Sequence, residues 1–253
     1  MRLELMTSPR VRDYLQRCTG IILPTGSTEQ HGPTGLIGTD HLCAEAIARQ
    51  FGERHGVIVA PTLQVGMSQF HLGFPGSLSL RPSTLAAVIH DFIASLAVTG
   101  FTRIYILNGH GGNVAPIRSA IQEYHAVQSF SRAAPSHVQC RLRSWWELKT
   151  VNALRNELYG AQEGSHATPS EISITLATHP EMISEFDLPA PGRPIDLLDH
   201  AGDHYLDAAD YRNRFPDGRV VSHSALARRE QGERLLAAAV ADLAGDFDAF
   251  LLS

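Results

Sequence analysis

The stretch PTGSTEQHGPTGLIGTDH, residues 24–41, sets the architecture that we predict for the rest of the chain. It follows the apolar run Ile21-Ile22-Leu23, which is typical of a buried strand, and it leads into a helix that starts near residue 40. Its four glycines and two prolines disfavour regular structure. We therefore predict a loop at the carboxyl end of a strand, where open α/β sheets place their active sites.

Three side chains of this stretch have metal-binding chemistry: Glu29, His31 and Asp40. Side chains two residues apart in extended chain point the same way, so Glu29 and His31 can face one metal ion, with Asp40 arriving from the helix start. The competing interpretation is a polar turn in which Thr39 caps the helix. The stretch alone does not decide between the two.

The composition narrows the classes of protein to consider. A length of 253 residues is compatible with one α/β domain over residues 1–253, and a net charge of −5 gives no basic surface for nucleic acid. Thirteen histidines favour a metal or proton-transfer site. The three cysteines form no C-x-x-C pair, which indicates reduced thiols. We find no apolar signal segment or membrane-length run, and therefore expect a cytoplasmic protein that does not bind membranes.

Strand and helix patterns alternate along the chain. The predicted strands cover 21–25, 57–60, 103–107 and 137–144, and the predicted helices 40–54, 83–98, 114–129, 146–157, 169–178 and 226–251. Residues 77–80 are predicted as an edge strand, residues 64–76 as a glycine-rich loop and residues 185–222 as a long surface excursion. Ser83 or Thr84 is expected to open its helix. The alternation predicts a mostly parallel sheet with helices on both faces.

The motif NGHGGN, residues 108–113, has two interpretations. A glycine-rich turn between a strand and a helix can bind phosphate through its backbone amides, but this turn lacks the Lys-Ser/Thr pair of a P-loop and the G-x-G-x-x-G spacing. In the other interpretation His110 lies at the strand end, and glycines such as Gly111 let the backbone approach a metal or a substrate.

A third group of candidate residues follows further along the chain. In HATPSE, Pro169 at the first helical position makes Glu171 an early helical residue, five positions after His166. Glu171 can also be only a helix-start carboxylate that the helix dipole favours. His71, in HLGFPG, is interpreted as a pocket wall and not as a ligand. Trp145, with its neighbour Trp146, is a further candidate for the pocket wall.

Taken together, LPTGSTEQHGP, the GTD triplet, FPGSLSL, NGHGGN and SHATPSE resemble the creatininase (creatinine amidohydrolase) family in content and order. The resemblance runs from residue 23 to about residue 175 and continues in the last helix. It implies a three-layer α/β/α sandwich with a two-metal centre, in a cytosolic homo-oligomer that is often a hexamer. Family members hydrolyse cyclic amides, formyl groups or peptide bonds, so a small-molecule substrate is expected.

The resemblance also assigns roles to residues. It implies that Glu29, His31, Asp40 and His110 bind metal, with Asp40 bridging, and that His166 transfers protons. Creatininase itself has a glutamate two residues after the NGH histidine, where this chain has Gly112. Two ions need more donors than the remaining ligands offer, so we predict Glu171 as a further ligand. Glu163 is the less favoured candidate, because it precedes Gly164 in chain that we expect to be flexible.

These residues predict a metal-dependent amidohydrolase. Two divalent ions, Zn²⁺ first with Mn²⁺ or Fe²⁺ as alternatives, would activate a bridging water, and the metal-bound hydroxide would attack a substrate carbonyl. His166 would protonate the departing nitrogen. Two other functions stay open at this point: a non-catalytic α/β protein that binds a phosphate-bearing ligand at NGHGGN, and a lyase or isomerase with the same centre.

Overall fold

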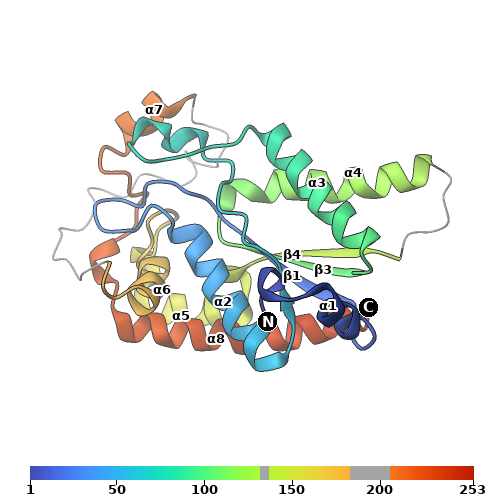
Figure 1. Ribbon diagram of the computed structural model, residues 1–253. Coiled ribbons are helices and arrows are strands. Elements are labelled where there is room, and N and C mark those ends of the chain that lie inside the picture. The colour runs from blue at the N-terminus through green and yellow to red at the C-terminus, as the bar shows by residue number, and fades with distance from the viewer. Residues whose placement is uncertain (132–136, 183–205) are drawn as a thin grey trace.

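Four parallel strands form the sheet in the computed structural model, which describes residues 1–131, 137–182 and 206–253. They are β1 (Gly20–Thr25), β2 (Ile58–Val59), β3 (Arg103–Asn108) and β4 (Gln139–Ser144), in the spatial order β2-β1-β3-β4. Thr25 at the end of β1 lies opposite Asn108 at the end of β3. The carboxyl ends of the strands therefore share one edge of the sheet (Figure 1).

Helices cover both faces of this sheet, which confirms the three-layer α/β/α fold (Figure 1). One layer holds α3 (Pro82–Val98) and α4 (Val114–Phe130). The opposite layer holds α2 (Thr39–His55), α5 (Lys149–Tyr159), α6 (Pro169–Thr178) and α8 (Arg229–Leu251). No described helix combines the length and the apolar character that crossing a membrane requires.

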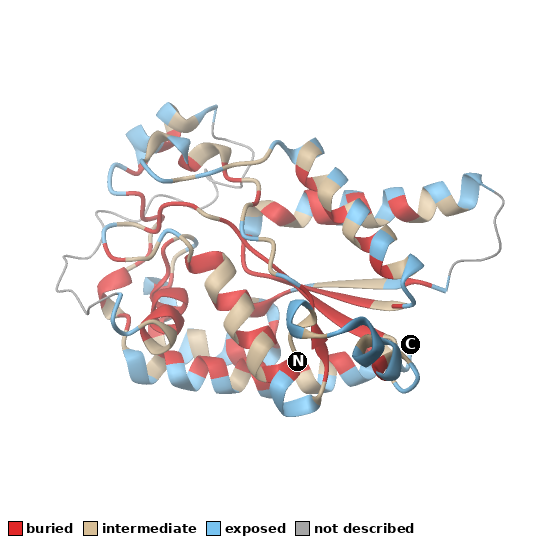
Figure 2. Ribbon diagram, viewed as in Figure 1, coloured by how far each residue is buried: buried red, intermediate tan, exposed pale blue. Residues whose placement is uncertain are grey.

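Strands β1, β2 and β3 are buried on both faces, which explains their apolar runs, whereas β4 at the edge of the sheet is only partly buried (Figure 2). In β1, Ile22 packs into the core beneath α2 and α8, whereas Ile21 and Leu23 pack into the core beneath α3 and α4. An unpredicted helix near the N-terminus, α1 (Ser8–Leu15), adds Tyr14 to the second core. Burial on both faces fixes the register of β1 and so the direction in which its following loop leaves the sheet.

Three helix starts differ from the prediction. Thr39 does not cap α2: Gly38 is the N-cap, and Thr39 Oγ1 donates to the Leu36 carbonyl at 2.6 Å. Neither Ser83 nor Thr84 opens α3, because the helix already begins at Pro82, whose ring suits the first helical position. The last helix starts later than residue 226, because a 3-10 turn at Ser224–Leu226 precedes it.

Two predicted segments also differ. Residues 77–80 do not form an edge strand: Leu78 makes only one antiparallel bridge, with Thr28. The described part of 185–222 is not a surface excursion, since it contains α7 (Ala208–Arg214) and an antiparallel bridge between buried Val220 and His166. The rest of that prediction, up to residue 205, lies outside the described residues. Residues 206–222 thus reach the carboxyl edge of the sheet.

Helices α6 and α8 make their closest approach at Gly232, where an added Cβ would lie 1.8 Å from the Ser173 carbonyl oxygen. We expect Gly232→Ala to force the helices apart at a cost of about 1–3 kcal/mol, lowering Tm by roughly 2–10 °C. Gly245→Ala is the matched control on the same helix, because an added Cβ there meets nothing within 4 Å. Thermal melts followed by circular dichroism compare the two, and equal Tm values would contradict this packing.

Candidate metal centre

Seven side chains with metal-binding chemistry meet at the carboxyl edge of the sheet. They come from the β1–α2 loop, the first turn of α2, the 3-10 turn Gln69–Gly73, the turn after β3 and the start of α6. The seven are Glu29, His31, Asp40, His71, His110, His166 and Glu171. The fold therefore gathers every predicted ligand, together with His166 and His71, in one place.

Asp40 lies between two imidazoles. Its Oδ1 is 3.1 Å from His31 Nε2, and its Oδ2 is 3.1 Å from His110 Nδ1. The carboxylate is 3% exposed, so water does not screen these contacts. Presenting one oxygen to each side is what a bridging carboxylate between two cations requires.

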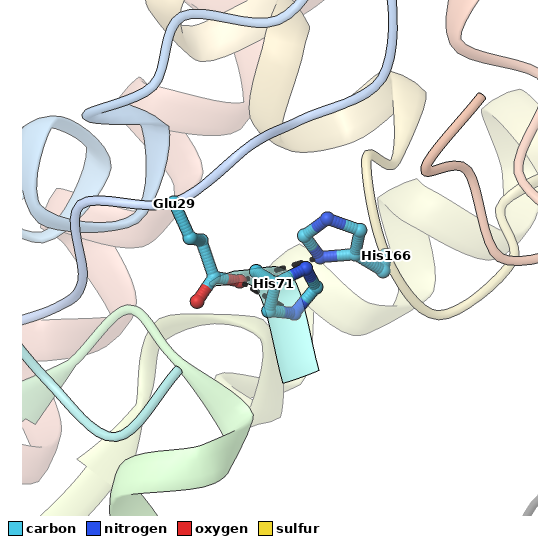
Figure 3. Close-up of side chains that lie close together, drawn as sticks. All are labelled: Glu29, His71 and His166. Carbon is cyan, nitrogen blue, oxygen red and sulfur yellow. Dashed lines mark ion pairs between the residues drawn. The ribbon is translucent and has the colours of Figure 1, made fainter. Parts of the chain in front are cut away.

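Glu29 is fully buried and faces His71 and His166 (Figure 3). Its Oε1 is 3.3 Å from His110 Nδ1, 3.3 Å from His71 Nε2 and 3.5 Å from His166 Nδ1. Its second oxygen, Oε2, accepts a hydrogen bond from Ser68 Oγ. Ser68 thereby turns Oε1 toward the imidazoles, and sequence reasoning missed this serine.

Backbone carbonyls determine which nitrogen of three histidines faces the carboxylates. Each ring uses one nitrogen to donate to a carbonyl oxygen: His31 Nδ1 to Glu29 at 3.0 Å, His110 Nε2 to Met67 at 2.9 Å and His166 Nε2 to Gln30 at 2.7 Å. The other nitrogen points at a carboxylate, and it can offer its lone pair to a cation that binds between the two groups. This is the arrangement in which proteins hold metal-ligating histidines.

His71 differs from these three rings, because Gln30 makes it turn its N–H toward the carboxylate. The Gln30 side-chain oxygen accepts from Gly32 N at 2.8 Å, so its amide nitrogen is the donor, at 2.9 Å from His71 Nδ1. His71 therefore carries its proton on Nε2, which faces Glu29. The sequence prediction of a pocket wall was incomplete: His71 lines the pocket and also contacts Glu29 directly. No local pattern in HLGFPG reveals this long-range contact.

The buried oxygens test whether a cation fits here. Glu29 Oε1 and Asp40 Oδ2 accept no hydrogen bond within the described part of the chain, although both are fully enclosed. Buried acceptors without donors are costly, and a cation would satisfy both. Glu29, His31 and Asp40 offer ligand atoms within 4.8 Å of one another, as do Glu29, His71 and His166. The mixed nitrogen and oxygen donors suit Zn²⁺, Mn²⁺ or Fe²⁺.

Glu171 combines the two roles that the sequence left open. Its Oε1 accepts from Thr168 N at 2.5 Å while Thr168 Oγ1 accepts from Glu171 N, which is a capping box at the start of α6. The same Oε1 is 3.8 Å from His31 Nε2. Glu163 is not in flexible chain as predicted: it is 8% exposed and its Oε1 is 2.8 Å from Arg155 Nε.

Gly112 has no room for a side chain. An added Cβ would lie 2.5 Å from the Met67 carbonyl oxygen and 2.6 Å from His110 Nε2, the two atoms whose hydrogen bond orients the His110 ring. A glutamate at this position would require the Met67 backbone to move. This backbone therefore excludes a carboxylate ligand at residue 112.

The asparagines of NGHGGN connect loops. Asn108 Nδ2 donates to the His110 carbonyl at 2.7 Å, and Asn113 Nδ2 donates to the Gly26 carbonyl at 2.9 Å. Asn113 Oδ1 also accepts from Met67 N at 3.0 Å. These contacts tie the turn to the two neighbouring loops, so the motif has a structural explanation that needs no phosphate.

A pocket of about 570 Å³ opens onto these residues. Its walls include the three predicted substrate-binding positions, His71, Gly111 and Trp145. The pocket wall also contains residues that the sequence analysis did not predict, among them Phe70, Arg155, Tyr211 and Val220. The volume suits a small ligand.

Burial and neighbouring charges shift the pKa values of the cluster. Burial alone would lower the pKa of His31, but Asp40 and Glu171 outweigh it and raise the value to about 10. For His110, Glu29 and Asp40 likewise outweigh burial and raise the pKa well above its usual value. Burial, with His71 and His31, lowers the pKa of His166 well below its usual value. His31 and His110 thus hold protons at neutral pH when no cation replaces them.

Fold and cluster together define a parallel α/β protein with a candidate divalent-metal site at the carboxyl edge of its sheet. The family model "Creatininase: Creatinine amidohydrolase" matches residues 4–246, and the chain belongs to the creatininase family. It is 31% identical to creatinine amidohydrolase of Pseudomonas putida over 245 residues, covering 88% of this chain and 86% of the relative. It is 27% identical to 3-dehydro-scyllo-inosose hydrolase of Thermotoga maritima over 257 residues, covering 91% of this chain and 77% of the relative.

A mycofactocin precursor peptide peptidase of Mycolicibacterium smegmatis is 37% identical over 107 residues, covering 40% of this chain and 43% of the relative. Among solved structures, a manganese form of creatininase superposes with a TM-score of 0.78 at 27% identity, covering 97% of this chain and 96% of that one. A creatininase mutant of Zn-Zn type gives a TM-score of 0.76 at 27% identity, with the same coverage. These relatives and the site support a metal-dependent amidohydrolase.

Because His31 and His110 are protonated in the metal-free protein, a metal must displace protons to bind them. We expect Zn²⁺ binding at pH 7 to release about two protons, and Zn²⁺ affinity to rise from pH 6 to pH 8 because proton release is favoured when the proton concentration falls. Calorimetry in buffers of different ionisation enthalpy counts the protons. Zn²⁺ binding to the His31→Asn variant should release about one proton fewer than binding to the wild type. A heat of binding that is the same in all buffers would contradict the assignment.

Proposed function

We propose that this protein is a dinuclear metal-dependent hydrolase that cleaves a C–N amide bond of a small substrate. The observation that carries the proposal is Asp40, whose two buried oxygens face two imidazoles held for metal binding. Divalent ions held there would act as Lewis acids toward a water molecule and toward the substrate carbonyl. Zn²⁺ is the first candidate, with Mn²⁺ or Fe²⁺ as alternatives, because the donors are nitrogen and oxygen without thiolate.

Two ligand sets follow from the distances. Glu29, His110 and Asp40 form one set, joined by contacts of 3.3 Å or less at His110 Nδ1. His31, Asp40 and Glu171 form the other, with contacts of 3.1 and 3.8 Å at His31 Nε2. Glu171 supplies the carboxylate that Gly112 cannot, which gives each set three protein ligands and leaves positions for water and substrate.

His166 is proposed to move the proton. Its low pKa keeps the imidazole neutral at neutral pH, and its Nε2–H is bound to the Gln30 carbonyl. The lone pair on Nδ1 therefore accepts a proton from the attacking water as the C–O bond forms. The same atom then gives that proton to the amide nitrogen as the C–N bond breaks, so that the amine leaves neutral.

The phosphate-binding alternative has less support. Asn108 already uses its side chain within the turn and Asn113 uses its side chain to hold a neighbouring loop, and the described residues that line the pocket include one arginine and no lysine. A lyase or isomerase would use the same centre, and product analysis distinguishes it from a hydrolase.

Metal removal is the first test. We expect chelation and dialysis to abolish amide hydrolysis, and Zn²⁺ or Mn²⁺ to restore it, because the centre supplies the nucleophile. Asp40→Asn should lose most of its metal, whereas His166→Ala should keep metal but lose about 10²–10⁴-fold in kcat. Elemental analysis and a panel of lactams, formamides and peptides measure both effects. Full turnover by demonstrably metal-free protein would rule the proposal out.

Metal stoichiometry tests Glu171. We expect about two ions per wild-type chain and about one in Glu171→Gln, since the second set would keep only two protein ligands. Glu163→Gln is the matched control, because Glu163 is equally buried but hydrogen-bonded to Arg155 and Ser170. An unchanged count in Glu171→Gln would limit this residue to capping α6.

A further inference from the structure

The pocket has a further polar group in its wall, Arg155 of α5. Arg155 is the one lysine or arginine among the described residues that line the pocket. Its Nε is 2.8 Å from Glu163 Oε1 and 3.2 Å from Ser170 Oγ. Its Cζ lies 5.8 Å from the centre of the Trp145 ring. A buried carboxylate, a hydroxyl and an aromatic ring thus hold the guanidinium in a defined place.

The terminal end of this guanidinium remains available. Both hydrogen bonds use Nε, and within residues 1–131, 137–182 and 206–253 neither terminal nitrogen makes a hydrogen bond or an ion pair. The two terminal nitrogens carry four N–H donors. Arg155 lines the pocket, and its terminal nitrogens are the donors that remain for a ligand there.

Arg155 and the candidate ligands belong to the same pocket. Ser170, which contacts Arg155, directly precedes Glu171, and Trp145 and Thr168 line the same pocket. The three carboxylates of the metal centre would repel an anionic group that is not bound to metal. The guanidinium gives such a group a separate place to bind, so a substrate can present an amide to the metal centre and an anion to Arg155.

We propose that Arg155 binds a carboxylate of the substrate, and that the substrate is an amide bearing a free carboxylate, such as an N-acyl amino acid or a C-terminal peptide unit. A carboxylate accepts two parallel hydrogen bonds from the planar end of an arginine. A phosphate dianion fits less well, because the Arg155 charge is shared with Glu163 and the described residues that line the pocket include no second lysine or arginine. The catalytic meaning of this site rests on the proposed function, whereas its ligand preference does not.

Binding of paired probes tests the preference without turnover. N-acetylglycine and N-acetyl-β-alanine are compared with their primary amides by calorimetry, on metal-free and Zn²⁺-loaded protein. A charge-assisted pair predicts that each acid binds about tenfold or more tightly than its amide. Inorganic phosphate should compete weakly. Equal affinities of acid and amide, no binding of either acid, or tighter binding of phosphate than of both acids would overturn the proposal.

Variants assign the preference to Arg155. Arg155→Gln alone leaves Glu163 buried without its partner and can unfold the protein, so the Arg155→Gln/Glu163→Gln double variant is tested beside it. The acid-over-amide ratio should fall to about one in the double variant and be reduced in Arg155→Lys, which keeps the charge but loses the planar end. Arg234→Gln removes an exposed charge outside the pocket and should leave the ratio unchanged. An acid-over-amide affinity ratio that is unchanged in the double variant would refute the role of Arg155.

Hydrolysis separates this proposal from the proposed function. If the Zn²⁺-loaded protein cleaves no amide, the proposed function fails while the binding ratios still decide about Arg155. If it does cleave amides, the ratio of kcat/KM for acid over amide substrates should fall in the double variant together with the binding ratio. Hydrolysis that shows no preference for acids would contradict the proposal.

Discussion

One carboxylate holds the centre together. Asp40 can face His31 and His110 at once because the first turn of α2 packs against the turn after β3, and an added Cβ on Gly109 would lie 2.1 Å from the Asp40 carbonyl oxygen. The separation of His110 from Asp40 is therefore set by backbone contact between two elements of the core. A side chain at residue 109 would separate the halves of the centre even if every ligand were kept.

The same region concentrates charge that a protein interior does not tolerate alone. Glu29, Asp40 and Glu171 are all buried within reach of the same imidazoles. Protons on His31 and His110 balance these carboxylates in the metal-free protein, and cations can take over that role. The fold is thus compatible with both states, and the backbone carbonyls keep the rings in place in each.

Local pattern was sufficient for part of this arrangement. Apolar runs bounded by glycine predicted the parallel strands, and strand-end loops predicted that Glu29, Asp40 and His110 would meet. The contact of His71 with Glu29 was missed, because it depends on where an irregular loop folds back. Residues 206–222 were taken for surface because their sequence has no periodicity, yet buried Tyr211 and Val220 reach the pocket. The tautomers of the site histidines also depend on three-dimensional contacts and cannot be predicted from local sequence.

Gln30 joins the metal-facing loop to the wall of the pocket. Its amide nitrogen reaches the Gly218 carbonyl at 3.1 Å as well as His71. Gly218 has φ +84°, and an added Cβ would lie 1.9 Å from Gln30 Oε1. The segment that carries Tyr211 and Val220 is thus fastened through backbone at a point where only glycine fits. The wall can therefore carry other side chains, and so accept other ligands, while its backbone anchor to Gln30 stays in place.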